Sequence, residues 1–310
     1  MRGAFFRTLM DVAERDDRVY LLVGDLGFGV VEPFVKKFPG RFINVGVAEQ
    51  NMTGVAAGLA LSGKVVFTYS IANFPILRCL EQIRNDVCYH RANIKIVSVG
   101  GGYSYGSLGM THHATEDIAI LRALPEMVVV APGDPIETEA ATRAVAEHAG
   151  PCYLRLGRAG EPKIHEEGVG FQLGKASRVR DGDALTLIST GALLETAVRA
   201  ADELATRGLG IRVLSMHTVK PLDNDSVLAA ARETGAIVTL EEHSVIGGLG
   251  GAVAECLAES NEPKVPFKRL GIPSTFSTDI GSQDYLRAQS GLCLDSIVAS
   301  IATMLQTIRI

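Results

Sequence analysis

Glu49 places a carboxyl group at the start of an otherwise small and apolar segment, VGVAEQNMTGVAAGLALSG (45–63). A glutamate in the first turn of a helix favourably meets the helix dipole, which is the simplest interpretation of this position. The helix predicted after it carries Gly54 and Gly58 one turn apart, so another element or a second subunit could approach closely. A carboxyl at such an interface loses contact with water and suits the sharing of a proton with a ligand.

Two adjacent histidines, His112 and His113, follow the glycine-rich stretch GGGYSYGSLG (100–109). Adjacent histidines do not easily converge on one ion and no partner cluster follows them, so no metal site is predicted here. The glycines fit neither a phosphate-binding loop nor a dinucleotide fingerprint. A loop histidine beside a glycine run is typical of a polar group that faces a pocket, with a surface histidine as the alternative.

Arg155 and Arg158 lie in and just after the apolar run CYLRL (152–156). The carboxyl ends of parallel strands are where α/β sheets bind ligands, and a guanidinium group binds phosphate through two hydrogen bonds. A salt-bridged surface arginine is the alternative for each. A second glycine cluster, in LEEHSVIGGLGGAVAE (240–255), resembles a dinucleotide loop in texture but lacks its spacing, so tight strand-to-helix packing is an equally good interpretation.

These residues are positioned by short apolar runs that alternate with longer helical segments, a pattern that predicts an α/β fold with mostly parallel sheets covered by helices. The runs are rich in β-branched residues and bounded by Gly, Pro or charge, as expected of buried strands. We expect strands at 19–23, 41–45, 64–68, 94–99, 127–131, 152–156, 184–189, 211–215, 236–240 and 265–270. We expect helices near 3–15, 48–61, 75–90, 115–124, 135–148, 192–207, 223–233, 249–260 and 293–307.

The 310 residues are long enough for two domains with sizeable cores. The composition of the sequence changes after residue 159, where Gly, Pro and charged residues follow one another with little periodicity. We therefore expect a first domain at 1–160, a linker at 161–180 and a second domain at 181–310.

Composition argues against several classes of function. The formal net charge is -5 without a basic block, so nucleic-acid binding is not indicated. No uncharged apolar stretch reaches the ~18 residues of a membrane span, and the amphipathic start is not a signal peptide. The five scattered cysteines lack a CxxC pair and favour reduced thiols. We therefore expect a cytoplasmic protein that binds neither membrane nor nucleic acid.

Four blocks, in order, resemble the transketolase family of thiamine diphosphate enzymes: the segment 45–63, LEQIRNDV (80–87), MTHHATEDIAILRALPEMVVVAPGD (110–134) and the segment 240–255. The chain is similar to the carboxy-terminal half, which split transketolases carry as a separate subunit. The resemblance covers nearly the whole chain. It implies a pyrimidine-binding domain followed by the family's carboxy-terminal domain.

The resemblance also implies roles for individual residues. Glu49 would share its proton with a ring nitrogen of the cofactor's aminopyrimidine, and so act in catalysis as well as cofactor binding. Phe74, which precedes Pro75 and would otherwise be assigned to the core, matches an aromatic residue that packs on the pyrimidine. His112 matches a histidine that faces the substrate, and Arg158 one that holds the sugar phosphate. The remaining cofactor-binding positions fall at Ile71 and Leu26.

Two departures from the family pattern concern the ligands. An aromatic residue of the pyrimidine pocket is replaced by Ile71, so simple apolar contact replaces stacking there. Gly100, Ser107 and Leu108 stand where ordinary transketolases carry a histidine and an acidic pair that contact donor hydroxyls. The resemblance therefore implies an unusual or modified donor sugar rather than a common ketose phosphate such as xylulose 5-phosphate.

The family's diphosphate and magnesium motif, GDG followed by Asn, has no match in this sequence. The resemblance thus implies that Mg2+ is bound through a partner, an amino-terminal transketolase subunit. Self-association through the pyrimidine domain would then give an α2β2 heterotetramer. Three alternatives stay open: a relative of deoxyxylulose-phosphate synthase, the beta chain of a 2-oxo-acid dehydrogenase, and a non-catalytic subunit that kept the fold.

Overall fold

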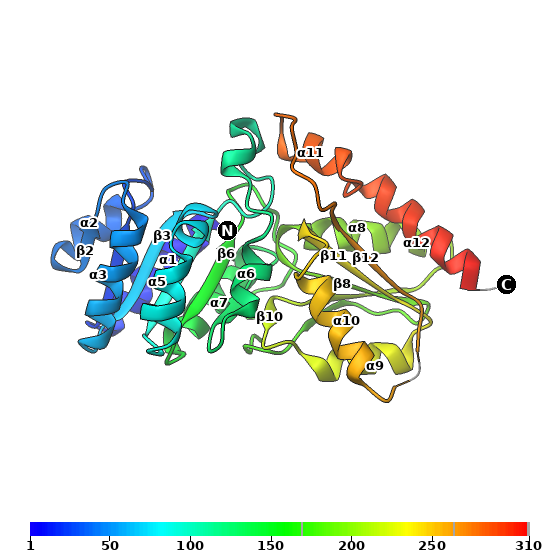
Figure 1. Ribbon diagram of the computed structural model, residues 1–310. Coiled ribbons are helices and arrows are strands. Elements are labelled where there is room, and N and C mark those ends of the chain that lie inside the picture. Colours follow the sequence, from blue (N-terminus) through cyan, green and yellow to red (C-terminus); the bar gives the residue numbers. More distant parts are fainter. Residues whose placement is uncertain (169, 263, 309–310) are drawn as a thin grey trace.

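The computed structural model describes residues 1–168, 170–262 and 264–308, and within them two α/β units stand side by side (Figure 1). One unit is built on a seven-stranded sheet and the other on a five-stranded sheet. Both sheets are mostly parallel and both are flanked by helices, which confirms the predicted fold class.

The first sheet has the strand order β10-β5-β6-β4-β3-β1-β2. Adjacent residues of its strands pack on opposite faces: Leu21 joins a cluster with Phe5 of α1, whereas Leu22 joins a cluster with Met52 of α3. Burial on both faces explains why these strands are nearly continuous apolar runs. The strands are β1 (Val19–Val23), β2 (Phe42–Asn44), β3 (Val65–Ile71), β4 (Ile94–Val99), β5 (Val128–Val130), β6 (Cys152–Leu156) and β10 (Thr218–Lys220).

Helices cover this sheet on both sides. The cluster on one face includes buried residues of α1, α2 and α7, and the cluster on the other includes residues of α3, α4 and α6. The helices are α1 (Arg2–Arg15), α2 (Glu32–Lys37), α3 (Glu49–Leu61), α4 (Phe74–Leu77), α5 (Leu80–Gln82), α6 (Asp117–Ala123) and α7 (Pro135–Glu147).

The second sheet has the order β12-β11-β8-β9-β7, with β7 antiparallel to β9 at its edge. Its strands are β7 (Ser177–Arg180), β8 (Leu185–Ser189), β9 (Ile211–Ser215), β11 (Ile237–Ser244) and β12 (Phe267–Ile272). Its helices are α8 (Leu194–Ala205), α9 (Asn224–Glu233), α10 (Leu249–Glu259), α11 (Gln283–Gln289) and α12 (Leu294–Ile308). The cluster that contains Leu22 continues through Met216 and Leu249, so one hydrophobic cluster extends across both units.

The structure departs from the predicted elements in three ways. The strand β10 belongs to the second half of the sequence but pairs with β5 of the first sheet, and β7 uses the last residues of the predicted linker. The short helices α2 and α11 were not predicted. The predicted helix at 75–90 is divided into α4, α5 and a π-helix at Ile83–Cys88.

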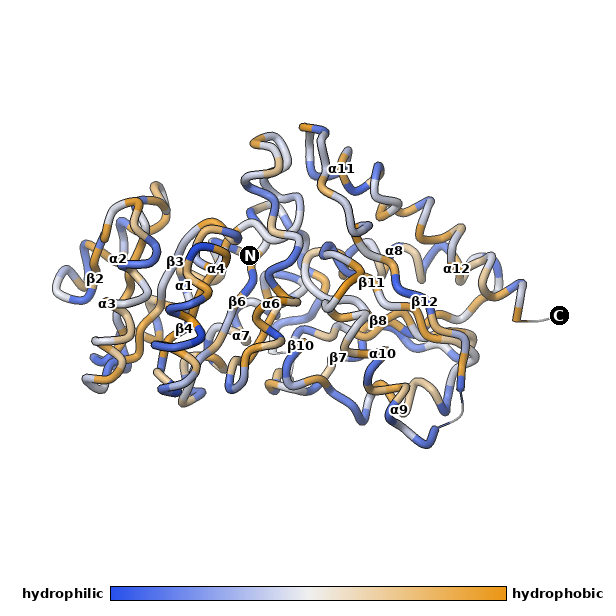
Figure 2. The backbone as a smooth tube through the Cα atoms, viewed as in Figure 1, coloured by the Kyte–Doolittle hydropathy of each residue, from blue (hydrophilic) through white to orange (hydrophobic). Residues whose placement is uncertain are grey.

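One segment of the described residues, Gln283–Ile308, has the length and apolar composition of a membrane span. It consists of α11 and α12, and hydrophobic residues recur along α12 (Figure 2). Ile297, Val298 and Ile301 pack into the core of the second unit. Only 28 % of its most apolar 18-residue stretch is buried, and a single segment of this kind is weak evidence for a membrane span. The expected absence of membrane binding stays a prediction.

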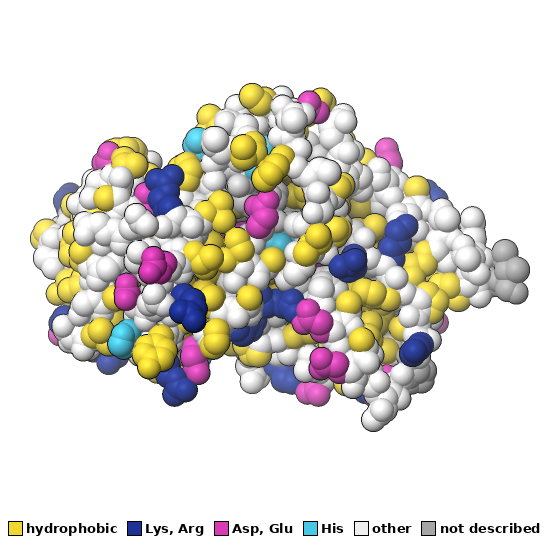
Figure 3. All heavy atoms as spheres, viewed as in Figure 1, with side chains coloured by type: hydrophobic (Ala, Val, Ile, Leu, Met, Phe, Trp, Pro, Cys, Tyr) yellow, Lys and Arg dark blue, Asp and Glu magenta, His cyan; other side chains and the backbone are white. Residues whose placement is uncertain are grey.

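The surface and the cysteines fit the compositional expectations. On the face shown in Figure 3, acidic and basic side chains are interspersed, without a field of one sign. All five cysteines are free, and Cys79, Cys88 and Cys152 are buried. Buried free thiols behave as small core residues.

Candidate active site

Most of the predicted site residues follow the carboxyl ends of adjacent strands in the first sheet. In parallel strands these ends meet at one edge, where open α/β sheets bind ligands. The order across the sheet is β6-β4-β3-β1-β2. Across that edge the chain therefore places Arg158 after β6, His112 after β4, Phe74 after β3, Leu26 after β1 and Glu49 after β2.

Glu49 is the first residue of α3, and it is only 1 % exposed. Its Oε2 accepts a hydrogen bond from Arg78 Nη1 at 3.0 Å, and the Arg78 side chain is half exposed. Gly24, at the end of β1, lies beside it: a Cβ there would be 3.5 Å from Glu49 Cγ. The carboxyl group is thus buried in its own chain and held by one guanidinium group.

Phe74 connects this carboxyl to the segment 110–115 around His112 and His113, called the histidine loop below. The Arg78 guanidinium carbon lies 4.7 Å from the centroid of the Phe74 ring. The same ring meets His112 edge-on at 5.1 Å, and His112 Nδ1 lies 3.0 Å from Thr111 Oγ1. Three predicted residues, Glu49, Phe74 and His112, are therefore brought together, with Arg78 as an unpredicted link.

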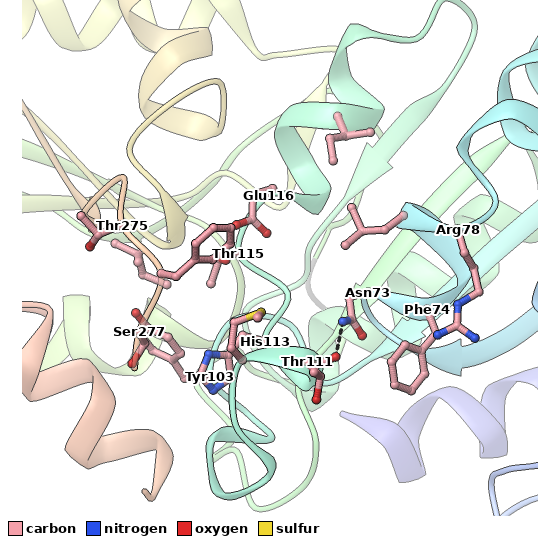
Figure 4. A pocket seen from close by; sticks show the side chains of 15 residues that line it. Asn73, Phe74, Arg78, Tyr103, Thr111, His113, Thr115, Glu116, Thr275 and Ser277 are labelled. Atoms are coloured by element: carbon pink, nitrogen blue, oxygen red, sulfur yellow. Dashed lines mark hydrogen bonds between the residues drawn. The ribbon is translucent and has the colours of Figure 1, made fainter. Parts of the chain in front are cut away.

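A cavity of about 600 Å³ opens beside Phe74, between α4, the histidine loop and the segment 272–277 (Figure 4). His113 rather than His112 lines it. His113 is buried, and burial lowers the pKa of its imidazole, so the ring is neutral near pH 7. The His113 ring meets Tyr103 edge-on at 5.0 Å. The two histidines thus face different surroundings.

Arg158 is exposed, and its guanidinium carbon lies 5.2 Å from the centroid of the Tyr105 ring. It lines a second cavity of about 410 Å³ together with Ser104, Ser107 and Gln283. Within the parts of the chain that the structure describes, no carboxylate forms an ion pair with Arg158. An uncompensated guanidinium at a cavity is available to an anion.

Arg155, the other predicted phosphate ligand, has a different role. It is 6 % exposed, and its Nε donates to Asp117 Oδ2 at 2.7 Å. It also donates to the carbonyl oxygens of Ala114 and Glu242. Burial alone would raise the pKa of Asp117, but the Arg155 guanidinium holds it below its ordinary value. The phosphate interpretation of Arg155 is therefore wrong, because its guanidinium group is buried and paired with Asp117.

Thr115 lies two residues before the helix α6 and does not cap it. The helix α6 begins at Asp117 with Glu116 at the N-cap position and no side-chain cap.

Replacing Arg155 by Met should lower the free energy of unfolding by about 3–5 kcal/mol, since it leaves the Asp117 carboxylate buried without its partner. Arg158→Met is a matched control three residues away, and at this exposed position we expect a change within about 0.5 kcal/mol. Urea unfolding of both variants measures the difference. Equal midpoints would show that the buried pair adds nothing to stability.

The glycine cluster at 247–251 builds a helix start rather than a nucleotide site. Glu241 accepts hydrogen bonds from the backbone N–H groups of Leu249 and Gly250, each at 2.7 Å, so a carboxylate of the chain itself occupies the start of α10. A Cβ at Gly248 would lie 2.1 Å from Glu241 Oε2. The packing interpretation of these glycines is therefore the correct one.

The glycine-rich loop carries no charged side chain at the three positions that depart from the family pattern. Ser107 and Leu108 are exposed. Gly100 has φ +91°, and a Cβ there would lie 2.1 Å from the Tyr105 ring. Among the described residues, no group of three His, Cys, Asp or Glu side chains could hold a metal ion.

Comparison with known proteins matches each half of the chain to a domain of one family. Residues 1–161 match the family "Transketolase, pyrimidine binding domain", and residues 174–297 match "Transketolase, C-terminal domain". A 6-deoxy-6-sulfo-D-fructose transketolase subunit from Clostridium sp. (strain MSTE9) is 44 % identical over 299 residues, which are 96 % of this chain and 92 % of that protein. An apulose-4-phosphate transketolase subunit from Phocaeicola vulgatus is 41 % identical over 274 residues, or 88 % and 87 % of the two chains.

A solved structure described as "Split gene transketolase, inactive beta4 tetramer" is 37 % identical, with a TM-score of 0.91 and 98 % of each chain covered. The fold and the matched families thus define a chain with two domains, a pyrimidine-binding domain followed by a transketolase carboxy-terminal domain. The chain belongs to the transketolase family. Its full-length likeness to single subunits supports a transketolase-type enzyme subunit.

Proposed function

We propose that this chain is the carboxy-terminal subunit of a split transketolase and works only with an amino-terminal partner. The assembled enzyme transfers a two-carbon ketol unit from a ketose donor to an aldose phosphate acceptor. The observation that carries this proposal is the buried Glu49 carboxyl, linked through Arg78 and Phe74 to His112 at the ligand-binding edge of the sheet.

These residues suit the aminopyrimidine of thiamine diphosphate. A buried carboxyl beside a glycine, Gly24, leaves room for a flat ring to approach, and Phe74 offers an aromatic surface. When bound, thiamine diphosphate supplies a carbon nucleophile for attack on the donor's carbonyl group. Glu49 would hold and share the proton at the ring nitrogen, Phe74, Ile71 and Leu26 would pack on the ring, and His112 would face the substrate.

The partner supplies the other half of the site. The missing GDG and Asn motif supports binding of the diphosphate and Mg2+ by the amino-terminal subunit. The relatives are named as subunits, and the similar structure named a split gene transketolase is described as an inactive β4 tetramer. These names support a chain that self-associates and needs a partner for activity. We propose an α2β2 assembly for the active enzyme.

The donor is proposed to be an unusual sugar. Gly100, Ser107 and Leu108 offer neither a charge nor an imidazole to donor hydroxyls. Two relatives are named for 6-deoxy-6-sulfo-D-fructose and apulose 4-phosphate, which are uncommon sugars. Both names include an acidic group, and Arg158 at its cavity would bind such a group.

Arg158→Ala should raise the Michaelis constant for sugars with a terminal phosphate about ten- to a hundredfold and leave that for unphosphorylated analogues nearly unchanged. A charge-assisted hydrogen bond is worth roughly 1.5–3 kcal/mol, which sets this range. The assay is ketol transfer by the assembled enzyme across a panel of ketose and modified-ketose phosphates. Arg7→Ala is the control, since Arg7 is exposed and pairs only with Glu139 on the surface.

Two outcomes of this panel would count against the proposal. Equal effects of Arg158→Ala on phosphorylated and unphosphorylated donors would remove the anion-binding role of Arg158. A wide preference of the unmodified enzyme for xylulose 5-phosphate would contradict the unusual donor inferred from the glycine-rich loop.

A further inference from the structure

The glycine-rich loop (100–109) is held by the second unit of the chain. Glu242, on β11, is 3 % exposed and points its carboxylate into this loop. Its Oε1 accepts hydrogen bonds from the Tyr103 backbone N–H at 2.7 Å and from Gln283 Nε2 at 3.0 Å. Its Oε2 accepts from Arg287 Nε at 2.9 Å. One carboxylate therefore joins the loop to α11, and the Arg287 charge compensates it.

Close packing fits the loop to α11. Gly102 has φ +65°, and a Cβ there would lie 2.5 Å from Glu242 Cγ. A Cβ at Gly106 would lie 2.6 Å from Leu286 Cδ1 and 2.8 Å from the carbonyl oxygen of Gly281. A side chain at Gly102 would need a strained backbone, and one at Gly106 would meet the backbone of Gly281, so these two glycines favour the close approach of the loop to α11.

The cavity of about 410 Å³ lies between this loop and the start of α11, so residues from both units line it. Three hydroxyl groups, of Ser104, Ser107 and Ser282, and the Gln283 amide line it together with Arg158. Arg158 is the one charged side chain among these lining residues in the described parts of the chain. Gln283 Nε2 donates to Glu242 at 3.0 Å and to Ser104 Oγ at 3.2 Å. Both of its N–H bonds are therefore used within the chain, and Gln283 braces the wall rather than donating to a ligand.

One guanidinium group beside the hydroxyl groups of Ser107 and Ser282 matches a tetrahedral oxyanion, whose several oxygens each accept hydrogen bonds. We propose that Ser282 and Gln283 of the carboxy-terminal domain form one wall of the pocket for the terminal oxyanion of the sugar, a phosphate ester or a sulfonate. Glu242 is the positioning residue that holds this wall against the loop. The inference rests on the proposed function and adds the carboxy-terminal domain to its substrate site.

Glu242→Gln and Gln283→Ala test the wall in the assembled enzyme. The first variant keeps the size of the side chain but removes its charge and replaces one of its two acceptor oxygens, which face Tyr103 and Arg287, by a donor. The second variant removes the Gln283 amide. Glu241→Gln is the matched control, because Glu241 is equally buried one residue earlier on β11 but binds the start of α10. Three donors of equal length are compared, ending in phosphate, sulfonate or hydroxyl.

For both test variants we expect the Michaelis constant for the phosphate- and sulfonate-terminated donors to rise about three- to tenfold, because displacing the wall weakens about one hydrogen bond from Ser282 to the oxyanion. The constant for the hydroxyl-terminated donor and the turnover number should stay within about twofold of the unmodified enzyme. Glu241→Gln should change none of these ratios. Whichever of the phosphate- and sulfonate-terminated donors shows the larger increase in its Michaelis constant ends in the oxyanion that the wall fits better. Equal changes for all three donors, or no change, would overturn the proposal.

A binding measurement separates this inference from the proposed function. Calorimetric titration of the assembled complex with glycerol 3-phosphate or 3-hydroxypropanesulfonate needs no catalysis. Affinity for at least one probe should fall about three- to tenfold in Gln283→Ala and Glu242→Gln and stay unchanged in Glu241→Gln. If ketol transfer is absent but this pattern holds, the proposed reaction fails and the oxyanion pocket stands. Unchanged affinity in both variants rejects the pocket even in an active enzyme.

Discussion

Glu49→Gln is expected to lower turnover of the assembled enzyme by at least about 100- to 10,000-fold, the range that general acid–base catalysis contributes. The glutamine keeps the size of the side chain and an oxygen that can accept the hydrogen bond from Arg78 Nη1. The contact of Arg78 with Phe74 should therefore persist, and so should the start of α3. What the amide cannot do is give up and regain a proton near neutral pH. Steady-state ketol transfer measures the loss.

The control for this variant is Glu137→Gln. Glu137 is also a fully buried glutamate in the first turn of a helix of the same unit, but its carboxylate accepts from Ser215 Oγ and the Gly133 N–H, away from the site. It should alter stability and leave turnover within a few-fold. Near-normal turnover in Glu49→Gln would instead assign Glu49 only to the helix dipole and the ion pair with Arg78.

The strands of the first sheet could be predicted because burial on both faces leaves a short apolar run in the sequence. The runs at 19–23, 94–99 and 152–156 coincide with β1, β4 and β6. β10 could not be predicted in the same way, because its three residues pair with β5, almost ninety positions earlier. β7 alternates half-buried with exposed residues at an edge, a weaker signal.

The candidate site could be predicted only in part. The resemblance to the family indicated Glu49, Phe74 and His112, and the structure places them together, although their roles stay predictions. Arg78 carries no local signal, since its importance comes from its two neighbours in space. The misassignment of Arg155 has the same origin, because its partner Asp117 lies 38 positions away and only the fold brings them together.

The central claim is that this chain holds the pyrimidine side of a site completed by another subunit. The most direct test is a calorimetric titration of thiamine diphosphate, with Mg2+, into the chain alone and into its mixture with the amino-terminal subunit, followed by a ketol-transfer assay of each. The chain alone should bind the cofactor weakly and transfer nothing, whereas the mixture should gain tight binding and transfer together. Tight, magnesium-dependent binding of thiamine diphosphate by the chain alone would contradict the claim.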